Sequence, residues 1–351
     1  MGEEGPYDVL YVGTREGKVL RGVLASDPEP HLALREWFPK RGEPGLGGGE
    51  MGGFLSCAPS LPEGIYSTPF VADSVVYIGT YGGKVYAIDA QDMTEKWEYP
   101  EKGDIGHIVG SPVVEGGVLY IGSSNGKLYA IDVETGKDAW SPFETGDDIW
   151  ATPAVHGGVV YIGSLDHNLY AIDAETGAEM WKFPTGGAIG STPLIYNDTI
   201  YIGSFDSKFY AINLDGSEKW RFDGAGNWFW SKAVVNDDII IVGCLDHRVY
   251  ALDAGSGEQA WPPFETEGQI RADLALAGDL VIIGSEDDKV YALDAGTGEQ
   301  AWRLPFVADG HIRAPLFAAK DMVFVYTTAG TLYALNAEDG KKLWDEVTRE
   351  P

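Results

Sequence analysis

Residues 161–181 read YIGSLDHNLYAIDAETGAEMW, and this stretch decides the fold. It opens with a short apolar segment that ends in glycine (161–163), and a polar turn leads to a second apolar segment at 169–173. A Glu-Thr-Gly turn then precedes Trp181. Alternating apolar and polar positions that are rich in β-branched and aromatic residues, and that are separated by turn residues, predict short β-strands.

The same pattern recurs along nearly the whole chain. Its glycine lies at Gly79, Gly122, Gly163, Gly203, Gly243 and Gly284. The 205 residues from the first to the last of these glycines make five steps, which gives a mean period of 41 residues. A further copy near the start has Gly13 at this position, and a copy near the end has Tyr326. The sequence therefore contains eight repeat units.

Each unit is predicted to contain four strands. The first of them, here termed the inner strand, opens with a Ser-Thr-Pro motif, as residues 191–195 do. The glycine-ending strand, the Leu-Tyr-Ala-Ile-Asp strand and the tryptophan-bearing strand come next. Four strands in a period of about 40 to 50 residues are typical of a propeller blade. We therefore predict an all-β, eight-bladed β-propeller with four antiparallel strands per blade and no helix longer than two turns, as a single domain over residues 1–351.

The first unit, residues 7–38, departs from this pattern because little chain precedes it that could form an inner strand. We expect residues 345–348 to supply this strand and so to close the ring. The step from Gly13 to Gly79 is 66 residues, which is 25 more than the period. Residues 39–64 account for the surplus, and their glycine-rich composition predicts a loop that acts as a lid or binds a partner.

The repeat resembles the quinoprotein-type (PQQ-like) β-propeller repeat, which residues 161–181 match almost position by position. That family includes the BamB-like lipoproteins of the outer-membrane β-barrel assembly machinery, quinoprotein alcohol dehydrogenases, and sensor domains attached to kinases. The resemblance implies a propeller fold and leaves the function open, because one fold supports several functions.

The charge of the chain excludes some classes of partner. The sequence has 25 basic and 54 acidic residues, and its net charge of −29 would repel nucleic acids and anionic membrane surfaces. No stretch has the roughly 18 to 20 consecutive apolar residues that a membrane-spanning helix needs. The two cysteines, Cys57 and Cys244, cannot build a disulfide framework or a thiolate metal site.

Many chemically conspicuous residues are explained by the repeat. Eight of the 11 tryptophans occupy the same repeat position, namely Trp37, Trp97, Trp140, Trp181, Trp220, Trp261, Trp302 and Trp344. The resemblance implies that they pack between neighbouring blades. Recurring aspartates such as Asp173 open turns in which the carboxylate can accept hydrogen bonds from nearby backbone N–H groups. The pairs Asp166-His167 and Asp246-His247 fall at predicted hairpin tips and are interpreted as turn residues.

The other three tryptophans lie where an inner strand begins. Aligning the units at this position gives a first column, Tyr66, Val109, Trp150, Gly190, Trp230, Arg271 and Arg313. Two residues earlier the units give a second column, Gly64, His107, Asp148, Ala188, Trp228, Gln269 and His311. Because the inner strands surround the axis of a propeller, both columns are predicted to ring the mouth of the central channel, on the same face as the hairpin tips.

The two columns contain the candidate ligand-binding residues. These are Tyr66, His107, Trp150, Trp228, Trp230, Arg271, His311 and Arg313. Tryptophan offers a stacking surface and arginine pairs with carboxylates, so such a site suits a planar or anionic ligand. The alternative is that these side chains fill the channel and that the arginines pair with Asp148 or Asp273.

Three functions are compatible with these observations. The first is a non-enzymatic, monomeric, BamB-like scaffold that binds a protein partner through the loops on the face where the inner strands begin. The second is a ligand-sensing propeller that uses the channel mouth. The third is a quinone-dependent dehydrogenase, which the resemblance links to PQQ with calcium. The third is disfavoured because Cys57 and Cys244 are not adjacent and no Glu/Asn/Asp calcium set can be placed.

The first function is therefore expected, with no catalytic residue, no metal site and no cofactor. Quinoprotein-type propellers are commonly exported, so the resemblance implies the cell envelope or the exterior. Residues 1–6 lack the basic start and apolar run of a signal peptide, which leaves a cytoplasmic location open.

Overall fold

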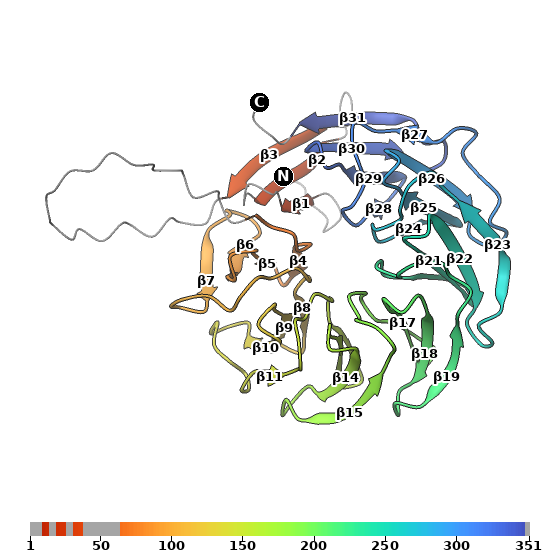
Figure 1. The fold of residues 1–351 in the computed structure, drawn as a ribbon. Helices are drawn as coiled ribbons and strands as arrows, with labels where there is room; N and C mark the ends of the chain where they lie inside the picture. The colour runs from red at the N-terminus through yellow and green to blue at the C-terminus, as the bar shows by residue number, and fades with distance from the viewer. Residues whose placement is uncertain (1–8, 14–18, 26–30, 38–63, 348–351) are drawn as a thin grey trace, which may run out of the picture.

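The computed structural model describes residues 9–13, 19–25, 31–37 and 64–347, and this part of the chain forms a ring of β-sheets (Figure 1). All regular elements in it are strands. One sheet has three strands, β1 (Val9–Gly13), β2 (Val19–Ala25) and β3 (His31–Trp37). Seven sheets have four strands each, and their strands are β4 (Phe70–Ala72), β5 (Val75–Gly79), β6 (Val85–Asp89), β7 (Glu95–Tyr99); β8 (Val113–Glu115), β9 (Val118–Gly122), β10 (Lys127–Asp132), β11 (Phe143–Glu144); β12 (Ala154–His156), β13 (Val159–Gly163), β14 (Asn168–Asp173), β15 (Glu179–Pro184); β16 (Leu194–Tyr196), β17 (Thr199–Gly203), β18 (Phe209–Asn213), β19 (Glu218–Phe222); β20 (Val234–Asn236), β21 (Ile239–Gly243), β22 (Arg248–Asp253), β23 (Gln259–Glu265); β24 (Ala275–Ala277), β25 (Leu280–Gly284), β26 (Lys289–Asp294), β27 (Phe306–Val307); and β28 (Phe317–Ala319), β29 (Met322–Tyr326), β30 (Thr331–Asn336), β31 (Lys342–Val347).

The prediction of eight four-stranded blades is wrong, because the structure has seven. The first repeat unit forms only the sheet β1-β2-β3, in which no inner strand pairs with β1 among the described residues. Residues 345–347, which we expected to pair with β1, lie in β31 and face residues 331–333 of β30. This register places Trp344 opposite Ala334, and tryptophans of other blades have the same pairing with an alanine. The tryptophan motif therefore assigns the tail to the outer edge of the last blade.

The three-stranded sheet lies in the ring between the blades β4–β7 and β28–β31 (Figure 1). Val12 of β1 packs against the buried cluster of the last blade, which includes Phe324. Val19 of β2 packs with Val76 in the cluster of the first four-stranded blade. The first unit thus bridges the two ends of the series of seven blades.

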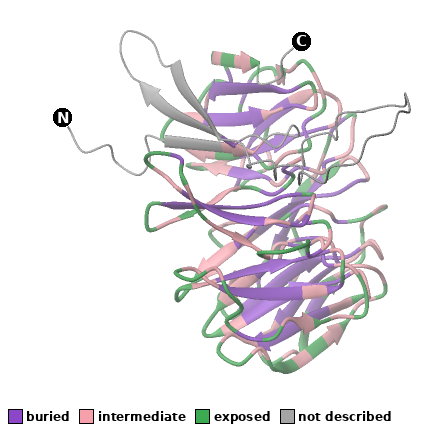
Figure 2. Cartoon of the chain, turned by 90° about the vertical axis from the view of Figure 1, so that its left-hand side faces the viewer, coloured by how far each residue is buried: buried purple, intermediate pink, exposed green. Residues whose placement is uncertain are grey.

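The two central strands of each blade form the core. In β13 and β14, residues 160–163 and 169–172 are all buried. Figure 2 shows this distribution, with buried residues along the central strands and exposed residues at many of the turns. Both faces of a blade pack against neighbouring blades, which explains why these strands have continuous apolar runs.

The repeat tryptophans join neighbouring blades, as the resemblance implied. Six of them donate a hydrogen bond from Nε1 to a carbonyl oxygen of the next blade at 2.8–3.2 Å, namely Trp97 to Val133, Trp140 to Ala174, Trp181 to Leu214, Trp220 to Ala254, Trp261 to Ala295 and Trp302 to Ala337. A glycine packs against each of these six indole rings. At Gly340, for example, the backbone has a φ of 71° and a Cβ atom would lie 2.5 Å from the Trp302 ring. The side chain of Trp37 lies outside the described residues.

The recurring aspartates cap the turn after the third strand of a blade. Asp173 Oδ1 accepts hydrogen bonds from the backbone N–H (2.8 Å) and the hydroxyl (2.7 Å) of Thr176. The same two contacts join Asp132 to Thr135 and Asp253 to Ser256. These hydrogen bonds, above all those from the hydroxyl groups, lower the pKa of the three carboxyl groups because they favour the charged form.

We expect protonation of Asp132, Asp173 and Asp253 to destabilise the fold in acid. Because each pKa is lower in the folded state than its usual value of 3.8, the charged form stabilises the fold above that value. This contribution is lost as the pH falls through the lower folded-state pKa. Replacing all three by asparagine should therefore make the decrease of the urea unfolding midpoint between about pH 5 and pH 2 shallower.

The turn itself should survive this triple replacement at neutral pH. Asn336 occupies the equivalent position in the last blade, and its Oδ1 accepts a hydrogen bond from the backbone N–H of Glu338 at 2.9 Å. An unchanged pH dependence in the triple variant would show that other carboxylates control the acid response.

Candidate functional site

In each of the seven blades, the hairpin between the second and third strands is tied to the segment before the inner strand. The residue two places after the repeat glycine position donates its backbone N–H to the carbonyl oxygen of a second-column residue at 2.8–3.0 Å. The pairs are Tyr81–Gly64, Ser124–His107, Leu165–Asp148, Phe205–Ala188, Leu245–Trp228, Glu286–Gln269 and Thr328–His311. We term the seven donor residues the hairpin column, and we term the surface formed by all three columns the mouth face.

These hydrogen bonds place the first and second columns at equivalent positions in all seven blades. The first column lies four residues before the inner strand, as Trp230 does before β20. The inner strands lie toward the centre of the ring (Figure 1), and neighbouring inner strands contact one another, for example β20 and β24. The hairpin tips therefore share one face with both columns.

Four aromatic side chains meet on this face. Phe205 stacks on Trp228, with ring centroids 4.5 Å apart, and on Trp230, with centroids 5.3 Å apart. The Trp150 and Trp230 centroids are 5.9 Å apart. Gly190 makes room for this group, because a Cβ atom there would lie 2.9 Å from the Phe205 ring. We term Trp150, Phe205, Trp228 and Trp230 the aromatic cluster.

Two arginines continue the aromatic cluster. The Arg271 guanidinium carbon lies 4.8 Å from the centroid of the Trp230 ring, which is a cation–π contact. Arg313 Nε donates a hydrogen bond to Glu286 Oε1 at 2.8 Å, and Arg271 Nε lies 3.4 Å from the same oxygen. We term Arg271 and Arg313 the arginine pair. Its two positive charges share one carboxylate.

The partner of the arginine pair differs from the one considered in the sequence. The alternative pairing with Asp148 or Asp273 is wrong, because both guanidinium groups pair with Glu286. Asp273 instead accepts a hydrogen bond from the backbone N–H of Lys232 at 2.6 Å, and desolvation raises its pKa. The buried Nε atom of Arg271 has no hydrogen-bond acceptor among the described residues.

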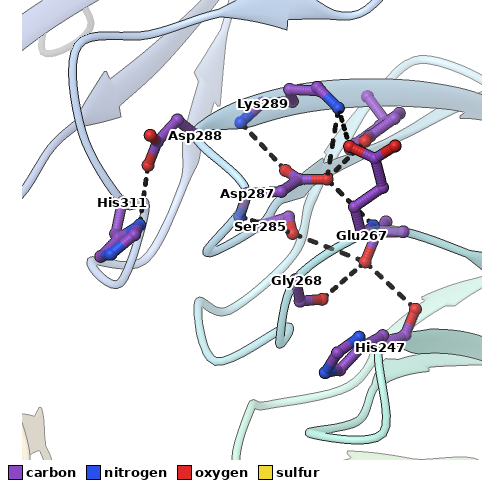
Figure 3. A network of polar contacts seen from close by, with 10 residues as sticks. His247, Glu267, Gly268, Ser285, Asp287, Asp288, Lys289 and His311 are labelled. Carbon is purple, nitrogen blue, oxygen red and sulfur yellow. Dashed lines mark hydrogen bonds and ion pairs between the residues drawn. The ribbon is translucent and has the colours of Figure 1, made fainter.

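The hairpin that carries Glu286 is held by polar contacts on both sides (Figure 3). Asp287 N–H donates to Ser285 Oγ at 3.2 Å, and Asp287 Oδ2 accepts from the backbone N–H of Glu267 at 3.1 Å. Lys289 Nζ contacts the carboxylates of Glu267 and Asp287. These contacts hold the hairpin tip in place, and with it the backbone that positions the Glu286 carboxylate beside the arginine pair.

The remaining candidates form two separate groups. Tyr66 and His107 both contact Tyr81, with ring centroids 5.1 and 4.1 Å from the Tyr81 ring. His107 Nδ1 also lies 2.6 Å from the Tyr81 carbonyl oxygen. His311 Nδ1 lies 2.7 Å from Asp288 Oδ1 (Figure 3). The eight candidates thus lie on one face, and their contacts described above form three groups.

Sequence reasoning missed four residues of these groups, Tyr81, Phe205, Glu286 and Asp288. The first three belong to the hairpin column, which was not aligned with the other two columns, and Asp288 lies two residues after Glu286. An alignment of the hairpin column would have revealed the three residues of that column. Two of its positions hold an aromatic residue and one holds an acid, whereas other blades have small polar residues there, such as Ser124 and Thr328.

The hairpin-tip pairs have a structural role. Asp166 Oδ2 accepts hydrogen bonds from Tyr170 Oη at 2.6 Å and from the backbone N–H of Gly146 at 2.7 Å. Asp246 makes the equivalent contacts. His167 and His247 have φ angles of 75° and 73°, at the turn position that glycine takes in other blades. Through these hydrogen bonds the two aspartates hold each hairpin tip to the neighbouring backbone segment.

The sequence also raised the question of a metal site and of the two cysteines. No group of three or more His, Cys, Asp or Glu side chains that could hold a metal ion occurs in the part of the chain described above. Burial raises the pKa of the Cys244 thiol, so this cysteine is not activated. Cys57 and the insertion up to residue 63 lie outside the described residues.

One further structural finding concerns membranes. Within the described ranges, no helix has the length and apolar character that crossing a bilayer would require.

Comparison with known proteins gives a family match. The sequence model described as outer membrane protein assembly factor BamB matches residues 58–146, 141–262 and 245–351. BamB from Moraxella catarrhalis is 22% identical, with a TM-score of 0.68, over 80% of this chain and 85% of its own. The computationally designed Ika8 protein is 16% identical, with a TM-score of 0.71, over 82% and 88% of the two chains. At these identities the two solved structures show a shared fold alone. A search of curated proteins gave no match.

Proposed function

Because the chain belongs to the family of the outer membrane protein assembly factor BamB, we propose that it is a non-enzymatic protein-interaction scaffold of the cell envelope. The family match across residues 58–351 carries this proposal. The acidic composition supports a protein partner over a nucleic acid, because a net charge of −29 repels phosphate backbones. The proposed scaffold acts as a monomer and needs no cofactor.

The mouth face is the proposed binding surface. Its side chains vary between blades while the backbone hydrogen bonds that tie the columns together stay the same. Tyr66, Tyr81 and Trp228 are exposed by 51%, 42% and 43%. Aromatic residues and arginine are enriched at protein interfaces, where they contribute much of the binding energy. The composition of this face therefore supports partner binding.

Site-specific photo-crosslinking in the native host tests this proposal. Benzoylphenylalanine replaces Tyr81 on the mouth face, and in a matched control it replaces Glu134. The control residue is exposed and lies in the turn after β10, at the opposite end of the strands. We expect the Tyr81 position to capture one defined protein that also binds the purified chain, and the Glu134 position to capture none. Equal capture from both positions, or none from Tyr81, would contradict the proposal.

A further inference from the structure

The centre of the mouth face differs in charge from the rest of the chain. The 21 residues of the three columns include two arginines, Arg271 and Arg313, and two acids, Asp148 and Glu286, so their formal charge is zero with neutral histidines. The whole chain, in contrast, has a charge of −29. Arg271 and Arg313 share the single carboxylate of Glu286, so these three side chains together carry one net positive charge. Asp288 on the same hairpin pairs with His311. The two guanidinium groups are therefore the place on this face where a carboxylate of a partner finds cationic donors.

The arginine pair has unused capacity for a carboxylate. A guanidinium group has five N–H donors in a planar fork, and such forks suit bidentate carboxylate binding. Here two guanidinium groups converge on one oxygen, Glu286 Oε1, so one carboxylate serves two forks. The Arg313 side chain is 44% exposed, so a second carboxylate can reach it from solvent.

The aromatic cluster lies directly beside this charge. Trp228 is its exposed member, and its ring is already stacked on Phe205. Together the aromatic cluster and the arginine pair extend over five consecutive blades, from the segment before β12 to the segment before β28. Because the proposed function is binding of a protein partner, we take the occupant of this surface to be a segment of that partner.

We propose that the aromatic cluster and the arginine pair anchor a segment of the partner protein in which an acidic residue is adjacent to an aromatic residue. This inference rests on the proposed scaffold function. The acidic side chain binds the arginine pair beside Glu286, and the aromatic side chain packs against Trp228. Around this anchor the hairpin tips carry acidic residues such as Asp206 and Asp246, so basic residues flank the anchor in the partner segment.

The direct test is calorimetric titration of the purified chain with the peptide acetyl-Lys-Gly-Glu-Phe-Gly-Lys-amide at low ionic strength. We expect at least a five-fold loss of affinity when the peptide Glu is replaced by Gln, and a similar loss when Phe is replaced by Ala. The double variant Arg271→Gln/Arg313→Gln should weaken the original peptide at least five-fold. The control Arg221→Gln should not, because Arg221 pairs with Glu218 on the outer strand β19.

The variant Glu286→Gln gives the sharpest test, because it should raise the affinity for the peptide whereas the double arginine variant should lower it. Removing the internal carboxylate leaves both guanidinium groups available, so this variant should bind the acidic peptide several-fold more tightly. A side-chain cluster that only fills the channel predicts no gain. Equal binding of the Glu and Gln peptides, or no gain with Glu286→Gln, would overturn the proposal. Equally tight binding of 3-phenylpropionate would also overturn it, since a small molecule would then suffice.

These outcomes are separable from the crosslinking result. Capture at Tyr81 combined with failure of the peptide experiments would leave the scaffold function standing and refute the anchor. Peptide binding as expected without capture at Tyr81 would refute the scaffold function in the form proposed above.

Discussion

Replacing Trp302 by alanine should lower the free energy of unfolding by about 3–5 kcal/mol, the range for truncating a buried tryptophan. Its side chain is 1% exposed and packs within the core cluster that joins the blades β24–β27 and β28–β31. The replacement also removes the hydrogen bond from Nε1 to the Ala337 carbonyl oxygen at 2.9 Å. Urea unfolding followed by tryptophan fluorescence, with linear extrapolation to water, measures the change.

Trp228→Ala is the matched control for this prediction. The residue type and the substitution are the same, but Trp228 is 43% exposed and lies outside the repeat position. Its loss should change the free energy of unfolding by less than about 1 kcal/mol. If Trp302→Ala destabilised the protein no more than this control, the tryptophans would not be what holds the blades together.

Gly163→Ala should destabilise the protein by about 1–3 kcal/mol through overpacking. A Cβ atom at Gly163 would lie 2.2 Å from Cγ2 of Ile189, far inside van der Waals contact. Gly122 and Gly243 have the same close contact with an isoleucine that precedes the next inner strand, at 2.1 and 2.3 Å. The repeat glycine is thus required by the close approach of neighbouring blades.

A double-mutant cycle isolates this contact. Ile189→Ala removes the Cγ2 atom and leaves the Cβ of residue 189 at 2.9 Å as the nearest side-chain contact, so Gly163→Ala should cost less in that background, which gives a favourable coupling between the two sites. Gly296→Ala serves as the control, because a Cβ atom there would meet Asp294 Oδ1 at an ordinary van der Waals distance of 3.5 Å. This control should stay within about 0.5 kcal/mol of the parent protein. Additive effects of Gly163→Ala and Ile189→Ala would rule out the steric explanation.

The repeat made most of the fold predictable and led to the wrong number of blades for an identifiable reason. Motif spacing detects strands that carry the motif, and the first unit has three of them. It does not reveal whether an inner strand pairs with β1. The tail was expected to do so, but pairing of Trp344 with Ala334 places it along β30 instead. This register was readable in the sequence, since the tail follows the same tryptophan motif as the other units.

The candidate site was predicted in position and only partly in its contacts. Both columns came from aligning the units, and the structure ties them to the hairpins by equivalent hydrogen bonds. The acidic partner was sought at Asp148 and Asp273, which lie in or near those columns in sequence. The actual partner, Glu286, lies in the hairpin between β25 and β26. The contact between Glu286 and the two arginines depends on how this hairpin folds toward the first column, and an alignment of the repeat units does not contain that information.

The hydrogen bonds between hairpins and columns have a consequence for how such a protein can change its specificity. They join backbone N–H groups to backbone carbonyl oxygens, so they impose no chemistry on the side chains at these positions. The second column, whose carbonyl oxygens accept these hydrogen bonds, holds glycine in one blade, tryptophan in another and glutamine in a third. Under the proposed function, substitutions in the second column and the hairpin column would change the binding surface while the hydrogen bonds between these columns remain, so specificity could change one residue at a time.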